Sequence, residues 1–200
     1  MTGVLERLMR ASVSMALKVQ PRRAFRQADH TLYSSPVSRE SLQLLRSAGR
    51  RLVGGGIAVN GMTAIGWRRS ENRIGVTADG ADLLDLGPES LTSVSVAGLD
   101  EVTGPAAEVV RAVREGAAAA VWAHPPRLLA MGASGRVPSR VVGELADRAG
   151  TIGLGDHGGR FDVTVFPGAG VLAIGTDAAD AAIRLEVAER LASVERGVNP

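Results

Sequence analysis

The chain has 200 residues, 45% of them hydrophobic and 3% aromatic, and its 23 basic and 21 acidic side chains leave a formal net charge of +2. Because cysteine is absent, disulfides, thiolate nucleophiles and thiolate metal sites are excluded, and a reducing cytoplasm is the expected location. The sequence has neither a run of about eighteen apolar residues nor a basic stripe interleaved with aromatic residues, so we expect no membrane span and no nucleic-acid partner.

The first 37 residues differ in pattern from the rest and are predicted to form a docking arm. Apolar residues recur at helical spacing from Met1 to Leu17, and Pro21 ends the pattern, which predicts one amphipathic helix followed by a connector. From Arg7 to Arg26 the segment has six bases and no acid. Such a segment also fits a transit peptide or a membrane-surface helix, but we favour an arm that docks on its own domain or on a neighbouring subunit.

Residues 38–200 are predicted to form one domain that begins with a helix at 38–51. Ser38 can cap this helix, and Gly54-Gly55-Gly56 end it. Phosphate-binding loops follow a strand and precede a helix, so we interpret these glycines, which follow a helix, as a bend. Short apolar segments separated by turn sequences come next and predict neighbouring antiparallel strands at 57–59, 63–67, 73–77 and 91–96.

The most informative stretch is Gly104–Pro126, in which a predicted helix leads directly into a strand. The apolar run 117–123 is too short for a membrane span and predicts a strand buried on both faces. Glu108 lies in the first turns of the helix, and His124 follows the strand. This carboxylate and imidazole could form an acid–base or metal constellation, although the stretch alone favours a helix-start charge and a hydrogen-bonded core edge.

The last third of the chain is predicted to contain short helices, a hairpin and one long helix. A glycine-rich loop at 151–160 holds His157, and Thr176 or Asp177 can cap the final helix. GAGVLAIG at 168–175 resembles a dinucleotide fingerprint, but no helix opens at its second glycine, so we discount it. The predicted helices are 127–131, 140–148 and 177–196, and the predicted strands are 162–166 and 170–174.

The order of these segments resembles the class II aldolase/adducin family over roughly Ser38–Arg196. The blocks that carry the resemblance are IGWR at 65–68, TADG at 77–80, LGPESLTSVSVAG at 86–98, PAAEVVRAVREGAAAAVWAHPP at 105–126 and GAGVLAIGTDAADAAIRLEVAERLA at 168–192. The resemblance to this family, which includes L-fuculose-phosphate aldolase, implies a three-layer α/β/α fold around a largely antiparallel sheet. It also implies a homo-oligomer, commonly a tetramer with sites between subunits.

The resemblance further implies a zinc-type metal site, and here the sequence departs from the family. Family enzymes hold a divalent metal with three histidines, and a nearby glutamate serves as ligand or acid–base. The glutamate corresponds to Glu108 and the second histidine to His124, whereas Trp122 and Ala169 stand at the other two histidine positions. One imidazole and one carboxylate do not make an open three-ligand zinc site, so we predict no metal cofactor unless His157 is recruited.

The implied phosphate pocket is altered as well. Ala64 and Gly66 stand where the family has hydrogen-bond donors, and Asp79 replaces a small hydroxyl residue, so a phosphate would meet a repelling carboxylate. We take Glu108 and His124 as candidate catalytic residues. The residues expected to contact a substrate are Trp67, Thr77, Asp79, Gly80, Trp122 and His157.

Three functions remain open from the sequence. The favoured one is a small-molecule-binding protein or metal-independent lyase-type enzyme in which Glu108 and His124 act as acid and base. The second is a structural or oligomerisation pseudoenzyme of the adducin-head type. The third is an active metal-dependent aldolase that uses Glu108, His124 and His157. We favour the first because the loss of metal ligands follows directly from residue types, whereas rescue by His157 needs a particular loop position.

Overall fold

The computed structural model describes residues 37–59, 61–98, 102–138, 144–155 and 161–198. The chain divides into two units, Met1–Ser34 and Ser35–Pro200, and all the described residues belong to the second. The predicted N-terminal helix, most of its connector, and His157 lie outside the described residues. None of the described helices is long and apolar enough to cross a membrane.

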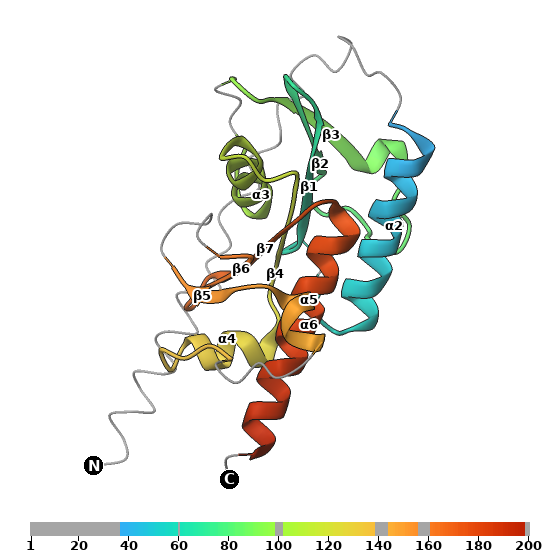
Figure 1. The fold of residues 1–200 in the computed structure, drawn as a ribbon. Coiled ribbons are helices and arrows are strands. Elements are labelled where there is room, and N and C mark those ends of the chain that lie inside the picture. The colour runs from blue at the N-terminus through green and yellow to red at the C-terminus, as the bar shows by residue number, and fades with distance from the viewer. Residues whose placement is uncertain (1–36, 60, 99–101, 139–143, 156–160, 199–200) are drawn as a thin grey trace, which may run out of the picture. The chain divides into compact units, whose positions relative to one another are not determined.

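A seven-stranded sheet forms the framework of the domain (Figure 1). Its strand order is β3-β2-β1-β4-β7-β6-β5, and every neighbouring pair is antiparallel except the parallel pair β5 and β6. The prediction of a largely antiparallel sheet is therefore confirmed. The strands are β1 (Ala64–Ser70), β2 (Arg73–Thr77), β3 (Leu91–Ser95), β4 (Ala119–Ala123), β5 (Ile152–Leu154), β6 (Val163–Phe166) and β7 (Gly170–Gly175).

Helices cover both faces of this sheet (Figure 1). On one face, α2 (Arg39–Gly54), α4 (Pro126–Gly132) and α6 (Ala178–Val198) share a buried core with the strands. On the other face, α3 (Pro105–Arg114) does the same. The short helix α5 (Glu144–Ala149) packs on α6, and a 3-10 turn, η1 (Pro88–Ser90), precedes β3. This arrangement confirms the predicted α/β/α layering.

Strand β4 lies at the centre of the sheet and is buried along its whole length. Successive side chains of a strand point to opposite faces. Ala119, Val121 and Ala123 accordingly belong to the core under α2 and α6, while Ala120 and Trp122 belong to the core under α3. The predicted strand buried on both faces is thus confirmed, and its alternation directs Trp122 toward the α3 face.

The predicted helix caps are confirmed by their hydrogen bonds. The Ser38 hydroxyl accepts a bond from the N–H of Ser41 at 3.0 Å at the start of α2. At the start of α6, the Asp177 carboxylate accepts bonds from the N–H groups of Ala179 at 2.8 Å and Asp180 at 2.9 Å. Such bonds satisfy amide groups that have no partner inside the helix.

Two predictions of local structure are wrong: one predicted strand is absent, and one predicted loop contains a strand. Residues 57–59 form no strand, because the N–H groups of Ile57 and Ala58 both donate to the carbonyl of Leu52 and continue the turn that ends α2. The predicted loop at 151–160 begins instead with strand β5, which pairs in parallel with β6. The other described elements differ from their predicted bounds by a few residues at their ends.

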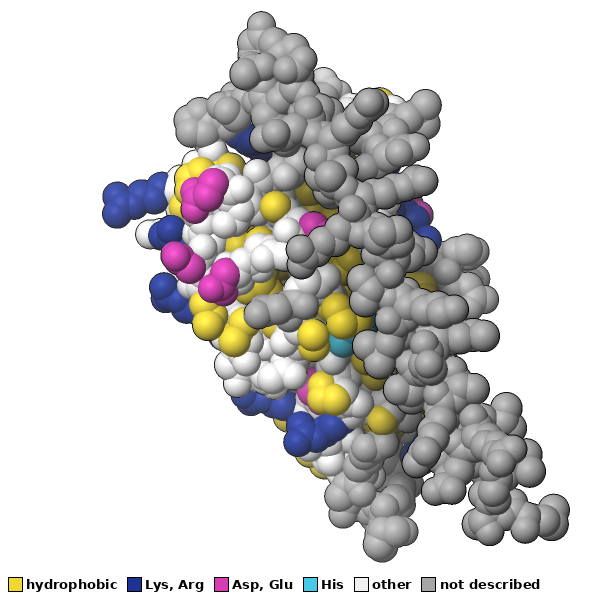
Figure 2. Space-filling view, turned by 180° about the vertical axis from the view of Figure 1, so that it is seen from behind, with side chains coloured by type: hydrophobic (Ala, Val, Ile, Leu, Met, Phe, Trp, Pro, Cys, Tyr) yellow, Lys and Arg dark blue, Asp and Glu magenta, His cyan; other side chains and the backbone are white. Residues whose placement is uncertain are grey.

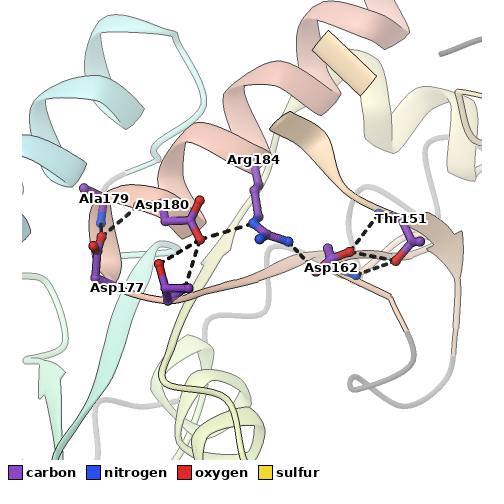
Figure 3. A network of polar contacts seen from close by, with 7 residues as sticks. Thr151, Asp162, Asp177, Ala179, Asp180 and Arg184 are labelled. Atoms are coloured by element: carbon purple, nitrogen blue, oxygen red, sulfur yellow. Dashed lines mark hydrogen bonds and ion pairs between the residues drawn. The ribbon is translucent and has the colours of Figure 1, made fainter. Parts of the chain in front are cut away.

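A polar network joins the start of α6 to the edge of the sheet (Figure 3). The Asp162 carboxylate accepts hydrogen bonds from the Thr151 N–H at 2.8 Å and hydroxyl at 2.9 Å, and it pairs with Arg184. Arg184 in turn lies 3.3 Å from the carboxylate of Asp180. These contacts hold the segments that precede β5 and β6 against the first turns of α6.

Candidate functional site

The pairing of the strands brings most of the predicted site segments to one end of the sheet, here called the β4 end. At this end β2, β4 and β6 finish and β1 and β7 begin, because Ala64 pairs with Trp122 and Ala123 pairs with Val171. The turn after β2, the residue after β4 and the β6–β7 hairpin therefore lie along a common border. These segments carry Asp79, His124 and Ala169, respectively.

Helix α3 begins at this same end. It packs against β4 and is joined to it by only four residues, so the two elements run in opposite directions. Glu108, in the first turns of α3, therefore lies toward the end of β4 that leads into His124. The structure thus brings the two candidate catalytic residues to one end of the same helix–strand pair.

His124 directly follows β4 and is half-buried. Its Nδ1 atom is buried and has no hydrogen-bond partner among the described residues. Its ring meets the ring of Trp122 edge to face, with centroids 6.2 Å apart. A buried polar atom without a hydrogen-bond partner raises the free energy of the folded state. A group that enters from outside the described chain and forms a hydrogen bond with Nδ1 would remove this cost.

Trp122 fills the space beside His124. Its side chain is 7% exposed, and its ring lies 5.5 Å from that of Phe166 in a tilted arrangement. A Cβ atom added to Gly170 would lie 2.3 Å from the indole, so the ring lies directly over this glycine at the start of β7. The indole has one N–H donor and no lone pair for a metal, which makes Trp122 a wall of the site.

The described residues do not fit the three-histidine metal site that the sequence resemblance implies. Trp122 and Ala169 offer no metal-ligating atom, which leaves His124 as the single imidazole at those three positions. Within the described ranges, no group of three or more His, Asp or Glu side chains lies close enough together to hold a metal ion. His157 falls outside these ranges.

Glu108 forms an ion pair with Arg111, one turn further along α3. The two side chains are 32% and 38% exposed, so the pair lies at the surface of the helix. Exposed pairs of this kind contribute little to stability. The Glu108 carboxylate can therefore exchange Arg111 for a ligand at low cost.

The other predicted contact residues occupy different surroundings. Trp67 belongs to the core under α2 and α6, with its ring over Gly75, where an added Cβ would lie 2.2 Å away. The two tryptophans therefore lie on opposite faces of the sheet. Thr77 is buried, and its hydroxyl accepts a hydrogen bond from the Ile65 N–H at 3.0 Å, which ties β2 to β1.

Asp79 and Gly80 form an exposed turn after β2. Gly80 has a φ of 74°, a left-handed conformation that favours glycine. Strand β1 lies between β2 and β4. At the usual spacing of about 4.8 Å between strands, the ends of β2 and β4 are about 10 Å apart along the β4 end. The turn follows the end of β2.

Sequence reasoning missed two residues of β6 that lie on the α3 side of the sheet. Phe166 contacts Trp122, and Thr164 is fully buried with a hydroxyl that has no partner among the described residues. Thr164 pairs with Leu172, which pairs with Trp122 on its other side. The alternation in VTVF, with valines in the opposite core, could have predicted the direction of both side chains.

Comparison with known proteins gives a clear match only in structure. No protein-family model and no curated protein matches the sequence. Among solved structures, L-fuculose-1-phosphate aldolase from Thermus thermophilus aligns with a TM-score of 0.63 at 18% identity, covering 82% of this chain and 99% of that one. The chain has a class II aldolase-like fold.

Two further structures agree with this assignment. The sugar-phosphate aldolase from Thermotoga maritima gives a TM-score of 0.60 at 16% identity, covering 80% of this chain and 95% of that one. The N-terminal class II aldolase domain of a conserved protein from Thermoplasma acidophilum gives 0.53 at 13% identity, covering 84% and 100%. The predicted fold of the class II aldolase-like domain is confirmed, and at these identities the likeness shows the fold alone.

Proposed function

We propose that this class II aldolase-like protein binds a small carbonyl compound at the β4 end of the sheet without a bound metal, and that Glu108 and His124 act on it as an acid–base pair. The observation that carries the proposal is the position of the Trp122 indole over Gly170. The Trp122 indole has no metal-ligating atom, and it lies between His124 and the hairpin that carries Ala169.

The surroundings of His124 support a role in proton transfer. Its buried Nδ1 has no partner among the described residues, so the ring can accept a proton from, or donate one to, a group placed against it. The Trp122 ring packs edge to face against the imidazole, and Phe166 contacts the Trp122 ring. Glu108, held only by a surface ion pair, supplies the second proton-transfer group at the same end of the α3–β4 pair.

The proposed reaction class is proton transfer next to a carbonyl group, as in a lyase. One group removes the proton of a hydroxyl on the β-carbon, the bond between the α- and β-carbons breaks as that hydroxyl becomes a carbonyl, and the other group protonates the α-carbon, which keeps the electron pair. Asp79, in the exposed turn beside the site, disfavours substrates whose phosphate would lie near it. A neutral carbonyl compound is therefore the substrate class that these residues suit best.

Metal content and binding of a neutral carbonyl compound test this proposal together. After dialysis against trace zinc, we expect well under one zinc, manganese or cobalt ion per chain by elemental analysis. In the same preparation, dihydroxyacetone at millimolar concentration should shift the NMR resonances of the His124 ring. The shift should disappear in Trp122→Ala if the indole walls the site, and it should persist in Gln43→Ala, which alters α2 on the other face of the sheet.

Stoichiometric metal that is lost in His157→Ala would overturn the proposal in favour of a metal-dependent aldolase built from Glu108, His124 and His157. A metal-free protein whose His124 resonances ignore dihydroxyacetone and other neutral aldehydes and ketones would contradict it differently. That result would favour a structural or oligomerisation role for the domain.

A further inference from the structure

A second candidate site lies on the opposite face of the sheet, in a groove between α2 and α6. The two helices run side by side there (Figure 1), and the groove has a volume of about 760 Å³. The described residues that line it are four arginines, one glutamate, Gln43, Ser47 and the glycines that end α2. The sheet separates this groove from the α3 face, toward which Trp122 points.

The groove is strongly basic. Its four arginines and single glutamate give the lining a formal charge of +3. The glutamate, Glu186, is 12% exposed and pairs with both Arg51, at 2.6 Å, and Arg190. Its charge is therefore shared between two guanidinium groups, and it fixes both of them along the α6 side of the groove.

The other two arginines that line the groove are Arg46 and Arg50. Arg46 donates its Nε–H to the backbone carbonyl of Leu86 at 2.8 Å, which orients its guanidinium. Across the described part of the chain, no carboxylate forms an ion pair with Arg46 or Arg50. Like charges gathered in one groove repel one another, and a bound anion would relieve that repulsion.

We propose that this groove binds a small molecule carrying two linked phosphate groups. Planar guanidinium groups bind phosphate oxygens in pairs of parallel hydrogen bonds. A diphosphate carries a negative charge of about the same size as the positive charge of the lining, and Gln43 and Ser47 add neutral donors. Among the described residues no aromatic side chain lines the groove, so these residues do not form the stacking surface that single-stranded nucleic acid requires.

Calorimetric titration of the full-length protein with inorganic pyrophosphate tests the proposal. We expect saturable binding at one site per chain that weakens from 50 to about 200 mM salt, because the groove is open to solvent. Arg50→Gln should weaken binding at least tenfold. Arg39→Gln is the matched control: it removes the same charge from the same helix, eleven residues and about 16 Å away, and should change affinity less than twofold.

A variant that is expected to strengthen pyrophosphate binding separates ligand binding from a purely structural role of the groove residues. Glu186→Gln removes the negative charge from the groove and releases Arg51 and Arg190, so pyrophosphate should bind more tightly even if the fold becomes less stable. Absence of saturable binding at millimolar pyrophosphate would overturn the proposal, as would equal losses in Arg50→Gln and Arg39→Gln. Binding to phosphatidylserine vesicles but not to pyrophosphate, lost in Arg50→Gln, would overturn it in favour of a membrane surface.

Discussion

At the scale of single residues, the side chains of both tryptophans pack in the same way, each over a glycine of the sheet. Each ring lies over a glycine of a neighbouring strand: Trp67 over Gly75 and Trp122 over Gly170. A glycine in a strand leaves a gap in the packed surface, and an aromatic ring from the next strand can fill it. A glycine on a neighbouring strand therefore accommodates each of the two indole rings.

Gly170→Ala tests whether Trp122 depends on this glycine. The added Cβ would lie 2.3 Å from the indole, so we expect the free energy of unfolding to fall by about 1–3 kcal/mol. In a Trp122→Leu background the same change should cost less than about 0.5 kcal/mol, because the clash is removed. Urea unfolding of the four proteins gives the coupling.

Gly54→Ala is the control for the general effect of replacing glycine. No atom lies within 4 Å of a Cβ added there, and the substitution lies in a helix, so it should be neutral or stabilising. Equal costs for Gly170→Ala in both backgrounds would mean that the indole does not lie over Gly170.

The candidate site was partly predictable at this scale. The segment order and the helix–strand connection predicted that Glu108 and His124 lie at one end of a buried strand, because short connections force neighbouring elements to run in opposite directions. The contact between Trp122 and Phe166 joins residues 44 positions apart through strand β7. Such contacts depend on the strand order, which local pattern in a single sequence does not fix.

At the scale of elements, the parallel pair of β5 and β6 depends on side chains outside the strands. Asp162 bonds to Thr151, the residue before β5, and to Arg184 on α6. The sequence offered no local indication of β5, because three residues with a central glycine are too short for an alternation pattern. The hydrogen bonds of Asp162 therefore add stabilisation to the β5–β6 pair, which the three residues of β5 alone provide only weakly.

This network predicts a specific dependence of stability on pH. Burial alone would raise the pKa of Asp162, but hydrogen bonds from Thr151 and the charge of Arg184 outweigh it, so the pKa lies below its ordinary value. An unfolded aspartate titrates near pH 3.9, at about which the stabilisation begins to be lost as pH falls through the folded pKa. The stability difference between the wild type and Asp162→Asn should therefore be largest at neutral pH and shrink below about pH 4.

Urea unfolding at pH 7 and at about pH 3 measures this difference. Asp147→Asn, which changes an exposed aspartate of α5, should leave the stability difference small at both values. If the loss in Asp162→Asn were the same at both pH values, the charge of Asp162 would not be what stabilises the parallel pair.

At the scale of the whole molecule, the described domain contains a complete layered fold. Two large buried cores, one on each face of the sheet, include residues of α2, α4 and α6 on one side and α3 on the other. Hydrophobic side chains remain visible on the side of the domain opposite to that of Figure 1 (Figure 2). The resemblance of the segment order to the class II aldolase/adducin family predicted this fold, although β5 has no alternation pattern of its own.

The last prediction concerns the unit formed by residues 1–34. Its predicted apolar stripe has at least six residues, and burying each is worth roughly 1.5–3 kcal/mol, so we expect it to dock on its own domain or on a neighbouring subunit. If it docks on a neighbouring subunit, deleting residues 1–34 should lower the number of subunits measured by light scattering. Circular dichroism should still show a cooperatively melting domain, because both cores lie within residues 37–198.

Point variants of the full chain distinguish docking from mere loss of length. Leu8→Asp places a charge in the apolar stripe and should reproduce the lower subunit number, because a buried carboxylate without a partner is strongly disfavoured. Ser14→Asp adds the same charge on the opposite side of the predicted helix, outside the stripe, and should leave the assembly unchanged. If deletion of residues 1–34 changed neither the subunit number nor the melting temperature, the segment would dock on neither subunit. Its apolar stripe would then have to be covered by another protein or by a membrane surface.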